Sequence, residues 1–595
     1  MNVVWTRNRI LLAAVLVMAV ALVRTGFSIG LDAVADARLP NPDSFYKLVL
    51  LEDHDPQTGL HFVARDNAPQ GNWVHWSLPH SWTVWQVHRP LVAAGLPQRP
   101  ALLWAGVGVT MVSMLLLSVL VALAVALHAS HRAALVSMLT LATSIPLLGY
   151  GRLDQITHHI FMLVPVAAAA VCFLRPLPPA PRAWPDALGG ALLGLALWIS
   201  PETMPLVAGF AAVRAVLKLE SAAPTPSLTP VAVGLLAVVA LGGWVDPPPP
   251  GYGAWALDHI SLAWLVFAAL LAVLLLLADA LAAMGVARHR ATGILAAAAA
   301  AAAAGWLLGV PGALHGPSGL IPHEMKVVWW DHIKELQSAQ TPHQWVAYLM
   351  MPWAAAALGG WAAWRTRRGS LALLALMALV YGLLGAWHLR MGAAGAVVAA
   401  LTLGLGLTQF RIFVNGVVDA SLTLRQQMAG LVLILLPVLQ MLLVLGLLLW
   451  QGTEAPAKHE GCALPAIAPA LNRLPPATVL VPVFDAPELL YRTHHRSVAG
   501  PYHHNVQGIL DVYRAWSDPD AEGARARAIV ARRGVDYLLG CTRIQRELRG
   551  TGAAPSLATR VRDGDVPDWL VPVPWDDDPV TDWRLYRVVA AGQPP

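Results

Sequence analysis

Apolar runs recur through most of this chain, and they restrict what it can fold into. A helix needs roughly 20 apolar residues to cross the hydrocarbon core of a membrane. A backbone in lipid must also satisfy its hydrogen bonds internally, which a helix does. The runs therefore predict about thirteen membrane-spanning helices. They cover residues 10–29, 101–128, 133–149, 157–174, 187–199, 205–217, 230–245, 260–287, 291–309, 345–363, 369–387, 392–409 and 428–450.

Composition supports a polytopic membrane protein with some water-exposed mass. Hydrophobic residues make up 57% of the 595 residues, and charged residues only 13%. A soluble protein of this size carries about 25% charged residues. The net charge of +5 is scattered, and no basic stripe carries interleaved aromatic residues, so nucleic acid is not expected as a partner.

The basic turns between the runs predict the orientation. The first run could be a signal peptide, but no clear small-residue cleavage site follows it, so we interpret it as a retained span. With a cytoplasmic N-terminus, the basic clusters 288–290 and 365–368 fall inside, as the positive-inside rule requires. An odd number of spans then places the polar loop 31–100 and residues 451–595 outside. For a bacterium this predicts an inner-membrane protein with a periplasmic C-terminal domain.

The C-terminal part has the pattern of a small α/β domain. Short apolar stretches predict strands at 478–484, 535–540 and 583–589, and the amphipathic stretch 520–533 predicts a helix. The fold class is therefore mostly α: a membrane helix bundle at 1–450, followed by a small α/β domain at 451–595.

The three cysteines fit this division of the chain. Cys172 lies in an apolar run and is expected to be an inert core residue. Cys462 and Cys541 both lie in the C-terminal part. An oxidising outer face favours a disulfide between them; the alternative is a pair of free thiols.

Charged residues at the ends of spans are the candidates for chemistry, because charge near the hydrocarbon is costly and usually functional. Asp43 opens the outer loop, although a helix-surface pair with Lys47 is the alternative. Asp154 and His158 are spaced to share a helix face. A carboxylate and an imidazole there suit a divalent ion; the alternative is a helix N-terminal acid with interfacial histidines.

Two further outer segments carry acids. Glu202 lies between Pro201 and Pro205, which break the helix and fix the carboxylate at the membrane surface. The loop 310–344 carries Glu324 near a tryptophan pair that could equally be an interfacial aromatic belt. The sequence contains no Walker A loop, so ATP is not expected to drive the protein. It also contains no nucleophile elbow and no convincing HExxH motif.

The order of these motifs resembles the GT-C superfamily of membrane glycosyltransferases, and more closely its bacterial members related to oligosaccharyltransferase catalytic subunits. The resemblance implies a helix bundle, often with a soluble C-terminal domain, that uses polyprenyl-phosphate-linked sugar donors. The motifs that carry it are Asp43-Ser44-Phe45-Tyr46, Val74-His75-Trp76-Ser77, Arg152-Leu153-Asp154 leading to His158-His159, Glu202 before Pro205, Thr493-His494-His495-Arg496, and Pro501-Tyr502-His503-His504-Asn505.

The resemblance also implies roles for individual acids. Asp43 would be the first-loop metal ligand or general base, and Asp154 would match the second acidic motif. The two would hold a divalent cation such as Mg²⁺ or Mn²⁺. That motif normally has another acid where Ile156 stands here, and Glu202 or Glu324 is expected to supply the missing oxygen.

The remaining site residues are expected to bind substrate. Arg152 would lie beside the donor phosphate, where a bidentate guanidinium is effective. His158 and His159 would lie close to it, and His75 and Trp76 would line the sugar site.

The expected function is transfer of a sugar or glycan from a polyprenyl-phosphate-type lipid donor to a glycan, lipid or protein acceptor on the outer side. The family's tryptophan-rich sequon-reading motif is missing from the C-terminal part, which argues against a peptide acceptor. The alternatives are a transporter or flippase of a lipid-linked glycan, with Asp43 and Asp154 as pathway charges, and a non-catalytic assembly protein. Acids at span ends and the lack of an internal repeat favour the enzyme.

Overall fold

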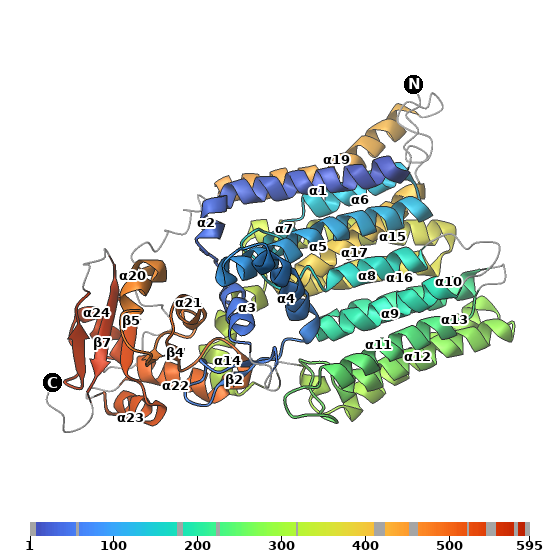
Figure 1. The fold of residues 1–595 in the computed structure, drawn as a ribbon. Helices are drawn as coiled ribbons and strands as arrows, with labels where there is room; N and C mark the ends of the chain where they lie inside the picture. Colours follow the sequence, from blue (N-terminus) through green and yellow to red (C-terminus); the bar gives the residue numbers. More distant parts are fainter. Residues whose placement is uncertain are drawn as a thin grey trace.

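Helices lying side by side form most of the molecule, and a small sheet with its own helices lies beyond one end of them (Figure 1). This computed structural model describes residues 7–54, 59–174, 183–221, 226–316, 319, 321–409, 423–450, 462–519, 523–542, 555–575 and 581–589. The predicted class, a mostly α membrane bundle with a small C-terminal sheet region, is confirmed.

Each predicted span corresponds to a helix, or in one case to a broken helix. By length and composition, seven of the described segments are able to cross a membrane; they begin at Gln98, Leu262, Arg288, Pro342, Gly369, Leu389 and Leu424. The multi-pass character is thus confirmed. The bundle helices are α1 (Arg7–Ile29), α5 (Gln98–His128), α6 (His131–Ala142), α8 (Leu163–Phe173), α9 (Trp184–Ile199), α10 (Met204–Glu220), α11 (Thr229–Val245), α12 (Leu262–Ala283), α13 (Arg288–Gly309), α15 (Pro342–Thr366), α16 (Gly369–Trp387), α17 (Gly392–Gly406) and α19 (Leu424–Trp450).

The predicted span 133–149 is the broken one. The Ser144 side chain accepts a hydrogen bond from Leu147 N at 3.4 Å and caps a new helix, α7 (Ile145–Tyr150). Pro146 in its first turn suits a helix start, because its missing N–H has no intrahelical partner there. Residues 151–162 then form turns before α8 begins, so Asp154 and the two histidines lie in a connection and not on a helix face.

The outer loop carries its own buried helix. Its elements are α2 (Leu31–Ala35), α3 (Pro42–Glu52), β1 (Phe62–Val63), β2 (Asn72–Trp73) and α4 (Leu78–Ala93). The Asn41 side chain accepts from Asp43 N at 2.9 Å, and Pro42 occupies the first turn of α3. Residues Ser44 to Leu51 are all buried. The cap therefore fixes Asp43 at the start of a helix whose position is set by packing.

The C-terminal domain contains a five-stranded mixed sheet with the order β4-β3-β5-β7-β6. β3 is parallel to β4 and β5, whereas β7 is antiparallel to β5 and β6. The three predicted strands correspond to β3, β5 and β7, and the predicted helix 520–533 corresponds to α23, with 520–522 outside the described residues. The elements are α20 (Leu464–Leu471), β3 (Thr478–Leu480), α21 (Ala486–Arg492), β4 (Arg496–Ser497), α22 (Val506–Ser517), α23 (Ala524–Arg533), β5 (Tyr537–Cys541), α24 (Leu557–Asp563), β6 (Leu570–Val573) and β7 (Trp583–Val588).

Cys462 and Cys541 form a disulfide, and their Cα atoms lie 5.9 Å apart. The bond joins Cys462, two residues before α20, to the end of β5. The two cysteines are 79 residues apart in sequence, and closing a loop of that length stabilises a domain by about 4 kcal/mol through the unfolded state. Cys172 packs, partly buried, against the apolar core of the bundle.

A buried carboxylate joins the outer loop to the C-terminal domain. Asp66 Oδ2 accepts from Tyr46 OH at 2.7 Å and from Asn72 Nδ2 at 3.0 Å, both within the loop. Asp66 Oδ1 accepts from Ser497 Oγ at 2.9 Å and from Gly500 N at 2.8 Å, both in the C-terminal domain. Because Tyr46 belongs to α3, this carboxylate fixes the C-terminal domain against the helix that begins at Asp43.

We expect Asp66→Asn to destabilise the protein by about 2–3 kcal/mol, since an amide brings two further N–H donors to a place where four donors already converge. Thermal unfolding of the full chain in detergent measures this as a lowered midpoint. Asp36→Asn is the control, because that side chain is 57% exposed in the same loop. Equal midpoints for the two variants would contradict the role given to Asp66.

Candidate functional site

Asp43 is a partly buried carboxylate at the end of the bundle. Its Oδ1 accepts a hydrogen bond from Tyr502 OH of the C-terminal domain at 2.9 Å. Burial and the negative charge of Glu335 raise the pKa of Asp43 to about 6, although Arg390, Tyr502 and Lys47 act in the opposite direction. Asp43 is therefore ionised in neutral water but is a better base than an ordinary carboxylate.

A network centred on Arg390 lies within electrostatic range of Asp43. Arg390 is in η6 (Leu389–Met391), between α16 and α17. Its Nη2 lies 3.1 Å from Glu202 Oε1, its Nη1 lies 3.7 Å from Glu335 Oε1, and its Nε donates to His159 Nε2 at 3.2 Å. Tyr150 OH donates to Glu335 Oε2 at 2.9 Å. We refer to Arg390, Glu202, Glu335, His159 and Tyr150 as the Arg390 cluster.

Glu202 reaches this cluster from the turn between α9 and α10. Ser200 caps η1 (Pro201–Thr203) by accepting from Glu202 N at 3.4 Å. Burial raises the pKa of Glu202 despite the positive charge of Arg390. Of the acids proposed to accompany Asp43, Glu202 is the one that the structure brings into this network.

Lys47 lies one helical turn after Asp43 and is buried. Its Nζ lies 3.9 Å from the centre of the Trp76 ring and donates to Ser81 Oγ at 3.3 Å. Burial lowers the pKa of Lys47 to about 7, although the charge of Asp43 acts against this shift. Trp76 itself is only 6% exposed and also packs against the ring of Tyr502. Trp76 supports Lys47 and Tyr502 and offers no open ring face for a sugar.

Asp154 is buried but is paired locally. Its two oxygens accept from Arg152 Nε at 3.0 Å and from Arg152 Nη2 at 2.6 Å. The next two residues do contact the start of α3, because Asn41 Nδ2 donates to Gln155 Oε1 at 3.1 Å and Ile156 N donates to Ser44 Oγ at 2.9 Å. The residues after Asp154 therefore contact the residues that flank Asp43, while Arg152 compensates the charge of Asp154.

This arrangement does not fit the expected cation between Asp43 and Asp154. Within the described ranges, two groups of His and Asp side chains have ligand atoms that converge within 4.8 Å, and neither group includes Asp43 or Asp154. A bidentate guanidinium already satisfies Asp154. We derive no step through a metal ion at these two residues.

The expected substrate-binding residues do not converge on one place. His159 is in the Arg390 cluster and stacks on His158, with ring centres 4.7 Å apart. Burial and the charge of Arg390 lower the pKa of His159 to about 3, so it is neutral. His75 lies instead against His503 of the C-terminal domain, with ring centres 4.5 Å apart. Glu324 pairs with Arg514 of α22 at 2.6 Å, and Glu335 from the same loop enters the cluster in its place.

Sequence reasoning missed Arg390, Glu335, Tyr150 and the contact of Tyr502 with Asp43. One signal for Arg390 was present: it is a basic residue in the turn 388–391, which the predicted orientation places outside, where the positive-inside rule disfavours positive charge. Tyr502 stood within the quoted motif 501–505, but no spacing rule connects it to residue 43.

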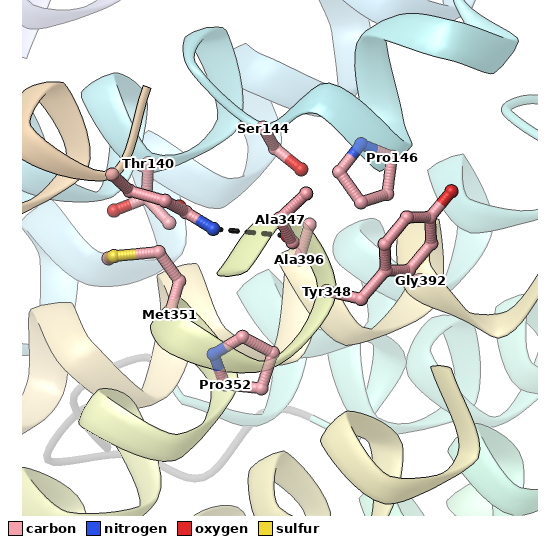
Figure 2. Close-up of a pocket in the computed structure, with 10 residues that line it drawn as sticks. Thr140, Ser144, Pro146, Ala347, Tyr348, Met351, Pro352, Gly392 and Ala396 are labelled. Atoms are coloured by element: carbon pink, nitrogen blue, oxygen red, sulfur yellow. Dashed lines mark hydrogen bonds between the residues drawn. The ribbon is translucent and has the colours of Figure 1, made fainter. Parts of the chain in front are cut away.

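A small pocket lies in the bundle between α6, α7, α15, α17 and α19 (Figure 2). Gly392, in its lining, begins α17 directly after the turn that holds Arg390. Gln440 of α19, also in the lining, donates to Ala347 O at 3.0 Å. The lining is mostly apolar and consists of Thr140, Ser144, Pro146, Ala347, Tyr348, Met351, Pro352, Gly392, Ala396 and Gln440.

Comparison of the sequence with protein-family models and with curated proteins finds no match. Solved structures do match. The oligosaccharyltransferase of Archaeoglobus fulgidus in the apo form has a TM-score of 0.65 at 14% identity, over 91% of this chain and 70% of that chain. The same enzyme, AglB, with an inhibitory peptide and a dolichol-phosphate gives 0.63 at 14% identity, over 90% and 69%. Its complex with zinc and sulfate gives 0.59 at 13% identity, over 90% and 68%.

The chain has the fold of a GT-C membrane glycosyltransferase. The similarity extends over nine-tenths of the chain, so it includes the bundle, the outer loop and the C-terminal domain. The resemblance derived from the sequence, to GT-C proteins related to oligosaccharyltransferases, is confirmed at the level of the fold.

We expect Arg390→Met to destabilise the protein by about 3 kcal/mol near pH 8, because it leaves Glu202 and Glu335 as unpaired charges. The loss should be smaller near pH 5, where these carboxyl groups can take up protons. Thermal unfolding in detergent at both pH values measures the difference. Arg288→Met is the control, since Arg288 pairs with Glu220 but is 44% exposed. A loss that does not change with pH would contradict the pairing.

Proposed function

We propose that the protein is a membrane glycosyltransferase that moves a sugar or glycan from a polyprenyl-phosphate-type lipid donor to an acceptor on the outer side. The observation that carries the proposal is a carboxylate of raised pKa, Asp43, within electrostatic range of a fixed guanidinium, Arg390, at one end of a bundle with the GT-C fold. The structurally similar AglB has been solved with a dolichol-phosphate, which supports a lipid phosphate as the donor carrier.

Asp43 is assigned as the general base. Tyr502 holds its Oδ1 by a hydrogen bond, and we assign the other oxygen to the acceptor hydroxyl. As that hydroxyl attacks the anomeric carbon, its proton passes to Asp43, and the bond from the anomeric carbon to the phosphate oxygen breaks. The base has a pKa of about 6, which suits proton transfer at neutral pH.

Arg390 is assigned to the leaving phosphate, which carries away the electron pair of the broken bond. Glu202, Glu335 and His159 hold the guanidinium in place from three sides. A cation fixed in advance stabilises developing negative charge more effectively than a mobile one. Arg152 is 39% exposed beyond Asp154 and can serve as a second cation at the edge of the site.

Orientation and domain division complete the proposal. We infer that the N-terminus is cytoplasmic, that residues 451–595 form a periplasmic domain after the membrane domain 1–450, and that the membrane is the bacterial inner membrane. Helix α1 begins at the end of the bundle away from the C-terminal domain (Figure 1). Arg288 Nη2 donates to Arg367 O at 2.6 Å, so the two basic turns used to predict the orientation meet at one place.

Asp43→Asn is expected to lower the transfer rate by about 100-fold or more, because the amide cannot accept the proton. The assay follows labelled sugar from a polyprenyl-phosphate donor to a membrane or soluble acceptor, with purified protein. Asp36→Asn, an exposed change in the same loop, should retain the wild-type rate. Retained transfer in Asp43→Asn would falsify the base assignment. Movement of intact donor across liposomes without transfer would favour the flippase.

The pH profile provides a separate measurement. Since the pKa of Asp43 is about 6, kcat/KM should fall as the pH drops through that value. Glu335→Gln removes a negative neighbour, so the midpoint should move to lower pH. Tyr502→Phe removes a hydrogen bond that favours the ionised form, so the midpoint should move to higher pH. Midpoints that move together, or not at all, would show that another group limits the rate.

A further inference from the structure

Three side chains from separate outer segments converge outside the Arg390 cluster. His61 lies just before β1, Asp246 follows the end of α11, and His259 precedes α12. Asp246 Oδ1 lies 2.8 Å from His61 Nε2 and 3.3 Å from His259 Nε2. All three ligand atoms lie within 4.8 Å of one another.

The two contacts are short enough for ion pairs, but they lack the geometry of good hydrogen bonds. Asp246 and His259 are each 1% exposed, and the His61 side chain is 17% exposed. Despite the short distances, Asp246 Oδ1 and His259 Nε2 have no hydrogen-bond partner of acceptable geometry among the described residues. Such unsatisfied buried atoms cost free energy unless another group satisfies them.

Neighbouring groups hold two of the three ligands, Asp246 and His259, in the way that metal sites hold theirs. Asp246 Oδ2 accepts from Leu78 N at 2.7 Å and from Trp198 Nε1 at 2.8 Å, which leaves Oδ1 to face the imidazoles. His259 Nδ1 lies 3.0 Å from Ile260 O. If Nδ1 donates this bond, the lone pair of Nε2 points to the centre of the group. Metal-binding histidines commonly donate their other N–H to a backbone carbonyl in this way.

We propose that His61 Nε2, Asp246 Oδ1 and His259 Nε2 bind a zinc-class transition-metal ion, with water in the fourth position. Two imidazoles with one carboxylate suit zinc better than magnesium or calcium, which prefer oxygen ligands. Metal–ligand bonds of about 2.0–2.2 Å place tetrahedral ligand atoms roughly 3.4 Å apart. The separation of 3.3 Å between His259 and Asp246 already matches this, and His61 needs to move only slightly.

The ion would be structural. It would hold the outer loop, the end of α11 and the start of α12 together. Through Trp198 it would also hold the end of α9, from which the chain continues directly to the turn that places Glu202 in the Arg390 cluster. The site is distinct from the carboxylates assigned to transfer, and its existence does not depend on the proposed function.

A neighbouring group provides a matched control. Asp258 Oδ2 accepts from His503 Nε2 at 2.6 Å and from His504 Nε2 at 2.8 Å. These are complete hydrogen bonds, and the His504 side chain is 28% exposed. The ligand atoms of this group also lie within 4.8 Å of one another, but hydrogen bonds explain these contacts without an ion.

The experiment measures zinc in the purified full chain by elemental analysis, then follows thermal unfolding in detergent after removal and return of zinc. We expect about one zinc per chain and a zinc-dependent rise in the midpoint of about 2–4 °C. His259→Gln should weaken zinc binding at least about 10-fold and abolish the rise, whereas His504→Gln should retain both.

A second variant distinguishes the loss of a zinc ligand from misfolding of the His259→Gln protein. His61→Gln changes the most exposed ligand of the three and should reproduce the loss of zinc. If zinc is absent from the wild type and does not raise its midpoint, the proposal is wrong. It is equally wrong if His504→Gln loses zinc and His259→Gln and His61→Gln keep it. Since none of these readouts involves sugar transfer, failure here and failure of the glycosyltransferase assignment are distinguishable.

Discussion

At the end of the bundle next to the C-terminal domain, the structure depends on buried carboxylates whose oxygens all need hydrogen-bond donors. Asp66 is the central case, because it is fully buried and takes hydrogen bonds from both the outer loop and the C-terminal domain. A charge in that position is tolerated only while all its donors are in place. The same docking brings Tyr502 to Asp43. The C-terminal domain therefore completes the site and is not an appendage to the bundle.

The site holds more acidic than basic side chains. Asp43, Glu202 and Glu335 carry three negative charges, while Arg390 and Lys47 supply two positive ones, and burial weakens the hold of Lys47 on its proton. Burial is the main cause that raises the pKa of Asp43 and of Glu202, and the negative charge of Glu335 adds to it. In the proposed transfer, the strengthened base and the cation held between two acids would act at opposite ends of one displacement, since the base takes a proton and the cation receives the leaving anion.

The sequence predicted those features that depend on residues close together in the chain. The apolar runs predicted the bundle, and the position of Asp43 after the first span marked it as a candidate, because both depend on neighbouring residues. Arg390 was missed because its partners lie far away in the chain. The sequence predicted Glu324 as a site residue, whereas the structure places Glu335 of the same loop beside Arg390. No local pattern shows which acid of a loop points inward. Strands β4 and β6 were missed because they span only Arg496–Ser497 and Leu570–Val573, too short for a clear alternation.

The outer segments also show how one carboxylate can serve two purposes through its two oxygens. Asp66 uses Oδ2 within the outer loop and Oδ1 for the C-terminal domain. Asp246 uses Oδ2 to hold the start of α4 and Trp198, and turns Oδ1 towards two imidazoles. The difference is what faces the second oxygen. N–H and O–H donors complete a hydrogen-bonded joint, whereas two imidazole nitrogens without hydrogen-bond geometry leave three lone pairs to converge, and a cation is what such a centre binds.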